Sequence, residues 1–267
     1  MLVRLLATAA LAGGITAAPI QPDPTPAVTT LKYRVGIGTS SVVDLSAFGQ
    51  GERQNNAGIT GFFTMTLTDT TGGQALVVVL DSMVVDSASQ EMATLQTAAD
   101  SAKGTTWSAL LRKDGKVENL TSAQLGVGAA QFESMLAAFF PRGEAHKRKQ
   151  GDTWSDTLSY TSTSETGSMS VTLRTTFTAA GEGTYHNAKA LRITSASTSN
   201  SSGSQVGPGG EVEIEGTGAG IGEYFVSKDG RYLGGTSTLD TDLLVTTSQA
   251  PMPIPLKQHA VITTTLL

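Results

Sequence analysis

The chain of 267 residues contains no cysteine, and only 15% of its residues are charged. The absence of cysteine excludes disulfides, zinc–cysteine and iron–sulfur sites, and catalysis by a thiol. It also excludes the lipid-modified cysteine of a bacterial lipoprotein. The charged fraction is well below the usual quarter or so of a globular domain, so few ionisable groups are available to form a catalytic site. The net charge of −5 argues against a nucleic-acid partner.

Serine, threonine and glycine stand where charged residues are missing. Ser and Thr together make up roughly a quarter of the chain, far above ordinary usage, and there are 30 glycines. Threonine is β-branched and suits the solvent face of a pleated strand. A hydrophobic fraction of 39% is too high for a disordered chain. The composition therefore predicts a β-rich globular protein.

The amino terminus has the pattern of an export signal. Arg4 precedes an apolar run over residues 5–15, and small residues follow at 16–18, which is the order found in secretory signal peptides. The run is shorter than the about 20 apolar residues of a membrane-spanning helix. We predict a signal peptide over 1–18, a Pro-rich spacer over 19–30 and a soluble periplasmic or extracellular protein. The alternative is a buried amino-terminal helix.

Three segments alternate between apolar and hydroxyl or other polar side chains, which predicts half-buried strands. Their apolar members are Phe63, Met65 and Leu67 in the first, Met169, Val171, Leu173 and Phe177 in the second, and Trp154, Leu158 and Tyr160 in the third. Residues 76–80 are apolar at every position. We therefore expect that strand to be covered on both faces.

Two segments have the features of helices that could cover such strands. Residues 90–102 have a helical composition, and residues 122–140 carry one apolar stripe that ends before Pro141. The stripe, at positions i, i + 3, i + 4 and i + 7, consists of Phe132, Met135, Leu136 and Phe139. We expect these apolar side chains to face the sheet.

A Lys-Asp-Gly turn signal occurs twice, at 113–116 and 228–231. Asp-Gly between strand-like runs favours a two-residue hairpin turn, in which both central residues have positive φ. The two signals lie 115 residues apart (228 − 113), and a weaker match relates Gly72 to Gly181, 109 residues apart (181 − 72). We interpret the matches as an internal duplication. The alternative is coincidence, because short β-segments of Thr and Gly arise easily.

The duplication predicts two related halves, 31–140 and 151–267, joined by a loop over 141–150. The helices fall in the first half only, and residues 199–210 of the second half are read as a Ser/Gly loop. One sheet shared by both halves buries more apolar surface than two small sheets, and a sheet of about ten strands curls. We therefore expect a single domain over 31–267.

The expected fold class is mainly β with one or two helices (α+β). The sheet is expected to be a large curved antiparallel sheet or a half-open β-barrel, with the helices on its concave face. The junction of the halves reads Phe139-Phe140-Pro141 and then Gly151-Asp152-Thr153-Trp154.

This junction resembles the FP…GDTW junction of uncharacterised bacterial secreted proteins and lipoproteins, families of unknown function with two β-rich halves. The specific part of the resemblance is limited to these residues, while the two-half pattern extends over most of the chain after the signal. In architecture alone, the expected shape is also similar to the half-barrels of Lol-type lipoprotein carriers, which hold acyl chains between a curved sheet and helices. That second likeness transfers no residue roles.

A search for catalytic and metal-binding patterns finds none. His146, His186 and His259 are scattered, and no Gly-x-Ser-x-Gly elbow is present. Asp240 and Asp242 would share one face of a strand, but two carboxylates do not supply the ligands that calcium needs. We expect no catalytic residues, no metal and no cofactor.

The concave face of the expected sheet predicts a site for a lipid or other apolar ligand. The residues proposed to line it are Phe132, Met135, Leu136, Phe139 and Trp154. The alternative for each residue is ordinary core packing. The alternative function is a structural or interaction module of the cell envelope without a small-molecule ligand.

One basic cluster falls in the loop between the halves and consists of Arg142, His146, Lys147, Arg148 and Lys149. Such a cluster suits contact with an anionic membrane surface. The alternative, which we favour, is a solvated loop in an acidic protein.

Overall fold

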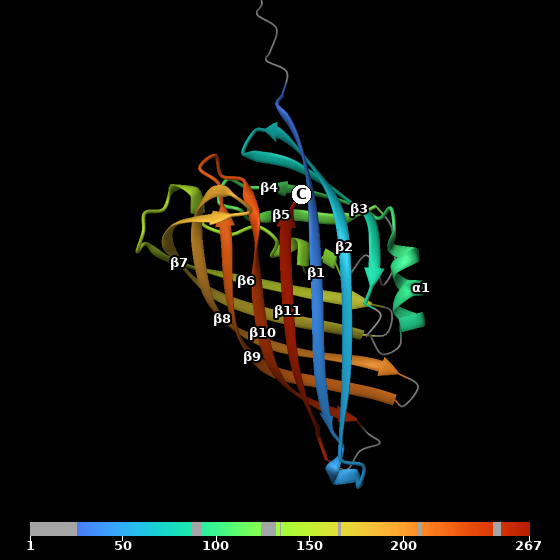
Figure 1. Ribbon diagram of the computed structural model, residues 1–267. Helices are drawn as coiled ribbons and strands as arrows, with labels where there is room; N and C mark the ends of the chain where they lie inside the picture. The colour runs from blue at the N-terminus through green and yellow to red at the C-terminus, as the bar shows by residue number, and fades with distance from the viewer. Residues whose placement is uncertain are drawn as a thin grey trace, which may run out of the picture.

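The computed structural model describes residues 26–86, 92–123, 132–133, 135–164, 167–207, 210–247 and 252–267 (Figure 1). The first half of the chain forms strands β1 (Val28–Asp44), β2 (Glu52–Thr70), β3 (Gly73–Val85), β4 (Thr106–Leu111) and β5 (Val117–Ser122). The second half forms β6 (Thr153–Ser164), β7 (Gly167–Tyr185), β8 (Ala188–Gly207), β9 (Gly210–Val226), β10 (Tyr232–Thr247) and β11 (Ile254–Leu266). All of these strands belong to one open antiparallel sheet with the order β5-β4-β3-β2-β1-β11-β10-β9-β8-β7-β6. The predicted fold class is confirmed.

The first and last strands of the chain lie side by side in the middle of the sheet. β1 pairs with β11, with Val35 opposite Thr264, and each half forms a meander from this centre to one edge. Consequently β5 and β6, which follow one another in the chain, form opposite edges. The described part of residues 132–152, here called the crossing segment, therefore passes from one edge of the sheet to the other.

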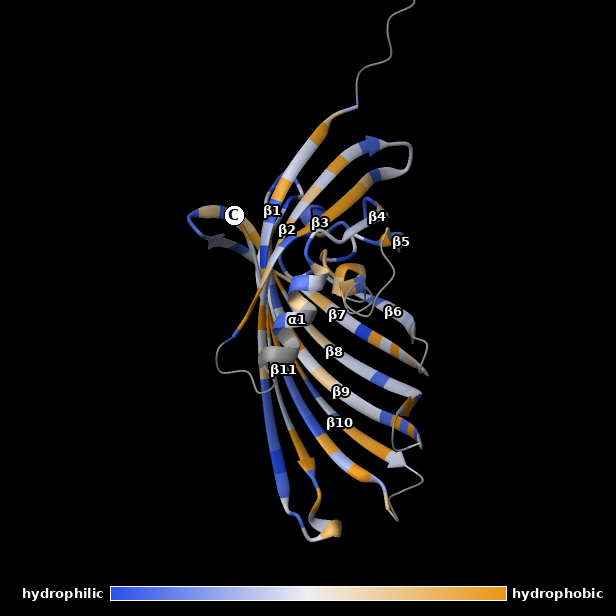
Figure 2. Cartoon of the chain, turned by 90° about the vertical axis from the view of Figure 1, so that its right-hand side faces the viewer, coloured by the Kyte–Doolittle hydropathy of each residue, from blue (hydrophilic) through white to orange (hydrophobic). Residues whose placement is uncertain are grey.

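The sheet bends around the helical part of the crossing segment, as both views show (Figures 1 and 2). Strand alternation directs Phe63, Met65 and Leu67 to this concave face, and all three are buried. Phe132 of the crossing segment packs against them, with its ring centroid 5.8 Å from that of Phe63 and 6.0 Å from that of Trp107. The predicted placement of apolar side chains on the concave face is confirmed for this half.

Hydroxyl side chains cover the convex face, as the alternation predicts. Cross-strand pairs of hydroxyls on β6 and β7 lie within hydrogen-bonding distance, at 2.9–3.1 Å. The pairs are Ser155 with Thr176, Ser159 with Thr172, and Thr161 with Ser170. The expectation that residues 76–80 are covered on both faces is wrong, because Val77 points to the convex side and is 39% exposed.

The structure confirms one predicted helix and shortens the other. Helix α1 (Met92–Ala102) confirms the expected helix from residue 92 onward, while residues 90 and 91 lie outside the described residues. In the second predicted helix, Ser122 instead ends β5, because it pairs with Trp107 of β4. The described helical residues there are 132–133 and 135–137, and two one-turn 3₁₀ helices occur at Ser46–Phe48 and Ala145–Lys147. Residues 124–131 lie outside the described residues. Among the described helices, none has the length and hydrophobicity needed to span a membrane.

The predicted loop over 199–210 is wrong, because residues 199–207 belong to β8 and Gly210 begins β9. The serines and glycines of this segment pair in register with residues of β7 and β9. The neighbouring strands therefore supply the backbone hydrogen bonds that hold the segment extended. The sequence lacks the apolar alternation by which an isolated strand is recognised.

The two Lys-Asp-Gly signals form hairpins of the same geometry. In each, the last residue of the first strand pairs with the first residue of the next strand, as Leu111 with Val117 and Val226 with Tyr232. Each returning strand then contains an irregularity at an equivalent residue with positive φ, Asn119 or Gly234. The shared geometry favours the internal duplication, which stays a prediction.

Two details of the duplication signal differ from expectation. The turns have three residues, and only the glycine, Gly115 or Gly230, has positive φ, so the two-residue turn is wrong. The β2–β3 and β7–β8 turns are also 115 residues apart (188 − 73), so Gly72 corresponds to Asn187 rather than to Gly181. The offset of 109 residues is therefore not followed by the strands.

Candidate ligand site in the concave face

The crossing segment is fixed at its carboxyl-terminal part by contacts with both edges of the sheet. The Gly143 amide donates a hydrogen bond to the carbonyl of Asp114 in the β4–β5 turn, at 2.6 Å. The Trp154 indole, at the start of β6, donates to the carbonyl of Arg142 at 2.8 Å. The segment therefore spans the open side of the sheet and contacts both of its edges.

A hollow of about 190 Å³ lies between the crossing segment and the second half of the sheet. The crossing segment contributes Met135, Ala138, Phe139 and Phe140 to its wall. The strands contribute further apolar side chains, namely Leu158, Leu173, Phe177, Leu239 and Ile262. The hollow is thus a mostly apolar concavity, which is the common form of a small-molecule site.

Small residues on β8 and β9 keep this space open. Ser195 and Ser197 of β8 line the hollow and pair with Gly222 and Gly220 of β9. A Cβ atom at Gly222 would lie 2.7 Å from the Tyr224 hydroxyl, so the Tyr224 side chain lies back across that glycine. In the first half, the same face carries large residues such as Tyr33 and Phe63. The hollow therefore exists because this part of the floor has little side-chain volume.

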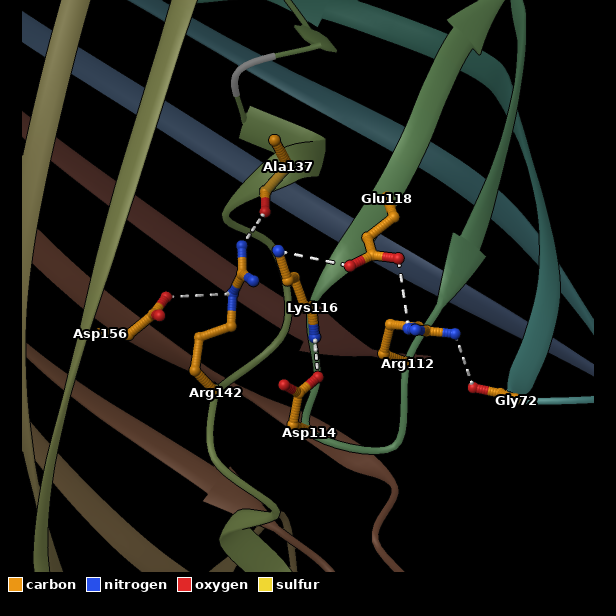
Figure 3. A network of polar contacts seen from close by, with 8 residues as sticks. All are labelled: Gly72, Arg112, Asp114, Lys116, Glu118, Ala137, Arg142 and Asp156. Atoms are coloured by element: carbon orange, nitrogen blue, oxygen red, sulfur yellow. Dashed lines mark hydrogen bonds and ion pairs between the residues drawn. The ribbon is translucent and has the colours of Figure 1, made fainter.

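Arg142 is the main polar feature of the wall (Figure 3). Its side chain is only 8% exposed, and its Nη2 donates to the Ala137 carbonyl at 2.7 Å. Its Nε lies 3.8 Å from Oδ2 of Asp156, whose side chain is 38% exposed. No described residue accepts a hydrogen bond from Nη1. The guanidinium is thus buried with one close acceptor and one distant carboxylate.

Two buried tyrosines mark the boundary between the filled and hollow parts of the concave face. The Tyr33 hydroxyl donates to the Tyr232 carbonyl at 2.7 Å, and Tyr232 lines the hollow. Burial raises the pKa of Tyr33 well above its ordinary value, and it does the same to the pKa of Tyr232. Both phenols are therefore neutral at physiological pH.

The residues predicted to bind a ligand lie in three different places. Met135 and Phe139 line the hollow. Phe132 and Leu136 instead lie in the buried core of the first half. Trp154 lies just behind the wall, with its ring stacked on Phe177 at a centroid distance of 5.5 Å. Sequence reasoning missed Arg142 as a wall residue, because it reads as one of several basic residues in a loop.

The basic cluster is not one exposed patch. Arg142 is buried, and the Arg148 guanidinium lies 4.9 Å from the centre of the Trp154 ring. Lys147 contacts Glu144 at 2.6 Å, and this hydrogen bond lowers the pKa of the Glu144 carboxyl. Of the residues in this cluster, His146, Lys147 and Lys149 remain exposed. Membrane contact stays a prediction that buried Arg142 does not support.

The sheet topology brings together a polar row on the convex face that the sequence does not reveal. Nδ1 of His259 lies 2.7 Å from Oδ1 of Asp240, and Ser40 is the partner of His259 on the other side. The side chains of His259 and Asp240 are 49% and 73% exposed. Among the described residues, no three His, Asp or Glu side chains are close enough to hold a metal ion.

The comparisons with known proteins supply no relative from which a role could be transferred. No protein-family model matches the chain, and no curated protein matches it.

Proposed function

We propose that the protein is an exported, non-enzymatic carrier or sensor that binds an apolar, lipid-like ligand in the hollow. The observation that carries this proposal is the unfilled, mostly apolar space between the crossing segment and the Ser/Gly floor of β8 and β9. Its volume of about 190 Å³ is below the roughly 300–1,000 Å³ of pockets for drug-sized ligands. We therefore expect one slender alkyl chain rather than a fused-ring compound.

Ligand binding can be followed through Trp154. Its ring stacks on Phe177, which lines the hollow, so an alkyl chain beside Phe177 changes the surroundings of the indole. Titration of the purified protein with dodecanol should change tryptophan fluorescence in a saturable manner. The Trp154→Phe variant should lose this signal but retain the heat of binding in calorimetry. Absence of saturable binding by either method would reject the proposed function.

A second experiment asks what the protein carries in its own host. Native mass spectrometry of protein purified from that host should show an additional mass that is removed by solvent extraction. The same preparation tests export, because we expect the mature protein to lack the predicted signal peptide. Retention of residues 1–17 on the mature cellular protein would contradict export.

The alternative function, an interaction module of the envelope, is favoured by the edge strand β6. This strand has 12 residues, and its sequence contains no Lys, Arg or Pro to discourage pairing with another strand. Concentration-dependent self-association in sedimentation experiments, abolished by Thr157→Pro, would favour this module. A monomer at all concentrations would favour the carrier.

We assign no catalytic role to the row of Asp240, His259 and Ser40. The histidine and the carboxylate are about half or more exposed to solvent, whereas catalytic electrostatics depend on exclusion of water. Wild-type protein and Ser40→Ala should therefore hydrolyse p-nitrophenyl acetate equally slowly. A loss of hydrolysis in Ser40→Ala would reject this assignment.

A further inference from the structure

We infer that the ligand is an anionic amphiphile whose oxyanion head group binds Arg142 while its alkyl chain lies in the hollow. This inference rests on the proposed function and adds the chemical class of the ligand. It starts from the position of the guanidinium. Arg142 is in the crossing segment, its side chain is 8% exposed, and it belongs to the wall of the hollow.

The guanidinium has more hydrogen-bonding capacity than the described residues use. Nη2 donates to the Ala137 carbonyl at 2.7 Å, and Nε faces Asp156 at 3.8 Å. Nη1 has no acceptor among the described residues, and none of the residues drawn in Figure 3 is joined to it by a dashed line. A buried cation is costly unless it is both paired and hydrogen-bonded, so this arrangement favours one further acceptor.

Asp156 compensates the charge only in part. Its carboxylate is at the outer limit of ion-pair distance and its side chain is 38% exposed, so water screens it. Among the described residues that line the hollow, Arg142 and Asp156 are the only ones with charged side chains. Apart from Asp156, the described residues around the cationic group in this wall are apolar or neutral. An oxyanion at the end of an alkyl chain matches this combination.

The geometry of the guanidinium limits which chemical classes of head group fit the site. A planar guanidinium offers parallel N–H donors that match the two oxygens of a carboxylate or phosphate. An alcohol presents only one oxygen, and an ammonium group repels the cation. An alkyl carboxylate and an alkyl phosphate share the required chemistry. Both are therefore included as probes.

The test measures binding of dodecanoate, dodecyl phosphate and dodecanol at pH 8 to wild-type protein, Arg142→Gln and Asp156→Asn. The two anions are used below their micelle concentrations and dodecanol below its solubility limit. For wild type, we expect at least one anion to bind about tenfold more tightly than dodecanol. Arg142→Gln should lose this preference, so that it binds the anions no more tightly than dodecanol. Asp156→Asn should show a larger preference for the anions over dodecanol than wild type does, because it removes a competing carboxylate.

The outcomes separate the inference from the proposed function. If dodecanol binds and the anions gain nothing from Arg142, the inference is overturned while the apolar site remains. If none of the three probes binds wild type, the proposed function itself fails. Which anion binds more tightly identifies the head group. If Arg142→Gln does not fold, the variants Arg142→Lys and Asp156→Asn replace it. Arg142→Lys should weaken anion binding and Asp156→Asn should strengthen it. Unchanged anion affinities in both variants would overturn the inference.

Discussion

The concave face is filled over β1–β4 and contains the hollow over β6–β11, although one continuous sheet forms both parts. In the filled part, Tyr33, Phe63 and Trp107 are fully buried beneath the crossing segment. In the hollow part, Ser197 and Gly220 occupy neighbouring positions of the same face. The comparison teaches that the volume of inward-facing side chains, rather than the fold, decides whether this sheet makes a core or a site.

The largest expected effect comes from removing a large side chain in the filled part. Phe132→Ala deletes a buried ring that packs edge-on against Phe63 and Trp107. We expect the free energy of unfolding to fall by about 3–5 kcal/mol in urea titrations. The matched variant in the hollow, Leu158→Ala, should lower the free energy of unfolding by about 1 kcal/mol, because the Leu158 side chain is only half-buried. Equal losses would contradict the comparison.

The two equivalent turns should respond differently, because the first meets the backbone of the crossing segment and the second meets only a side chain of it. Gly115 has a φ of 82°, and an added Cβ would collide with the Pro141 carbonyl. Gly230 has a φ of 87°, but an added Cβ would meet only the His146 ring, 3.2 Å away. We expect Gly115→Ala to lower stability by about 2–3 kcal/mol and Gly230→Ala by about 1 kcal/mol. Thermal and urea unfolding of both variants measure the difference.

Filling the hollow should remove binding without harming the fold. Ser197→Leu places an isobutyl group in the hollow, where Ser197 is half-buried. We expect dodecanol affinity to fall by about tenfold or more, while the free energy of unfolding changes by less than about 1 kcal/mol. Thr198→Val, on the convex face beside it, is the control and should leave both quantities unchanged. Undiminished dodecanol binding in Ser197→Leu would place the ligand elsewhere.

The filled part is the one that the sequence predicts well. Its strands alternate large apolar and hydroxyl residues, as in Phe63, Thr64 and Met65, and this pattern directly indicates which face is buried. The edge-to-edge order of the strands does not follow from the same pattern. Pairing of β1 with β11 joins residues more than 200 positions apart, and periodicity carries no signal for it.

The end of β8 beyond the hollow is hard to predict because its side chains are small and polar, as are those of Ser195 and Ser197 in the hollow. Ser199 and its neighbours have small polar side chains, so they resemble a loop in sequence although they form β8. Arg142 resembles its basic neighbours in the loop, and its burial depends on Ala137 and Asp156, which the fold alone brings to it. Only two of the five predicted ligand residues, Met135 and Phe139, line the hollow.

The smallest effect is expected at the boundary between the two parts, where Tyr33 donates to the Tyr232 carbonyl. Burial raises the pKa of Tyr33 above the ordinary value near 10, so the folded state holds its proton at pH values where the unfolded chain releases it. The contribution of Tyr33 to the free energy of unfolding is therefore fully present below pH about 10 and decreases as the pH rises further. Tyr33→Phe should lose about 1 kcal/mol at pH 7, from the missing hydrogen bond.

In urea titrations above pH 10, wild type should lose up to about 1.4 kcal/mol per pH unit for each such tyrosine. Tyr33→Phe should show a shallower slope, because only the raised pKa of Tyr232 then contributes from this pair. If the slope is the same in both proteins, Tyr33 is open to solvent in the folded state. The boundary would then belong to the hollow part rather than to the filled one.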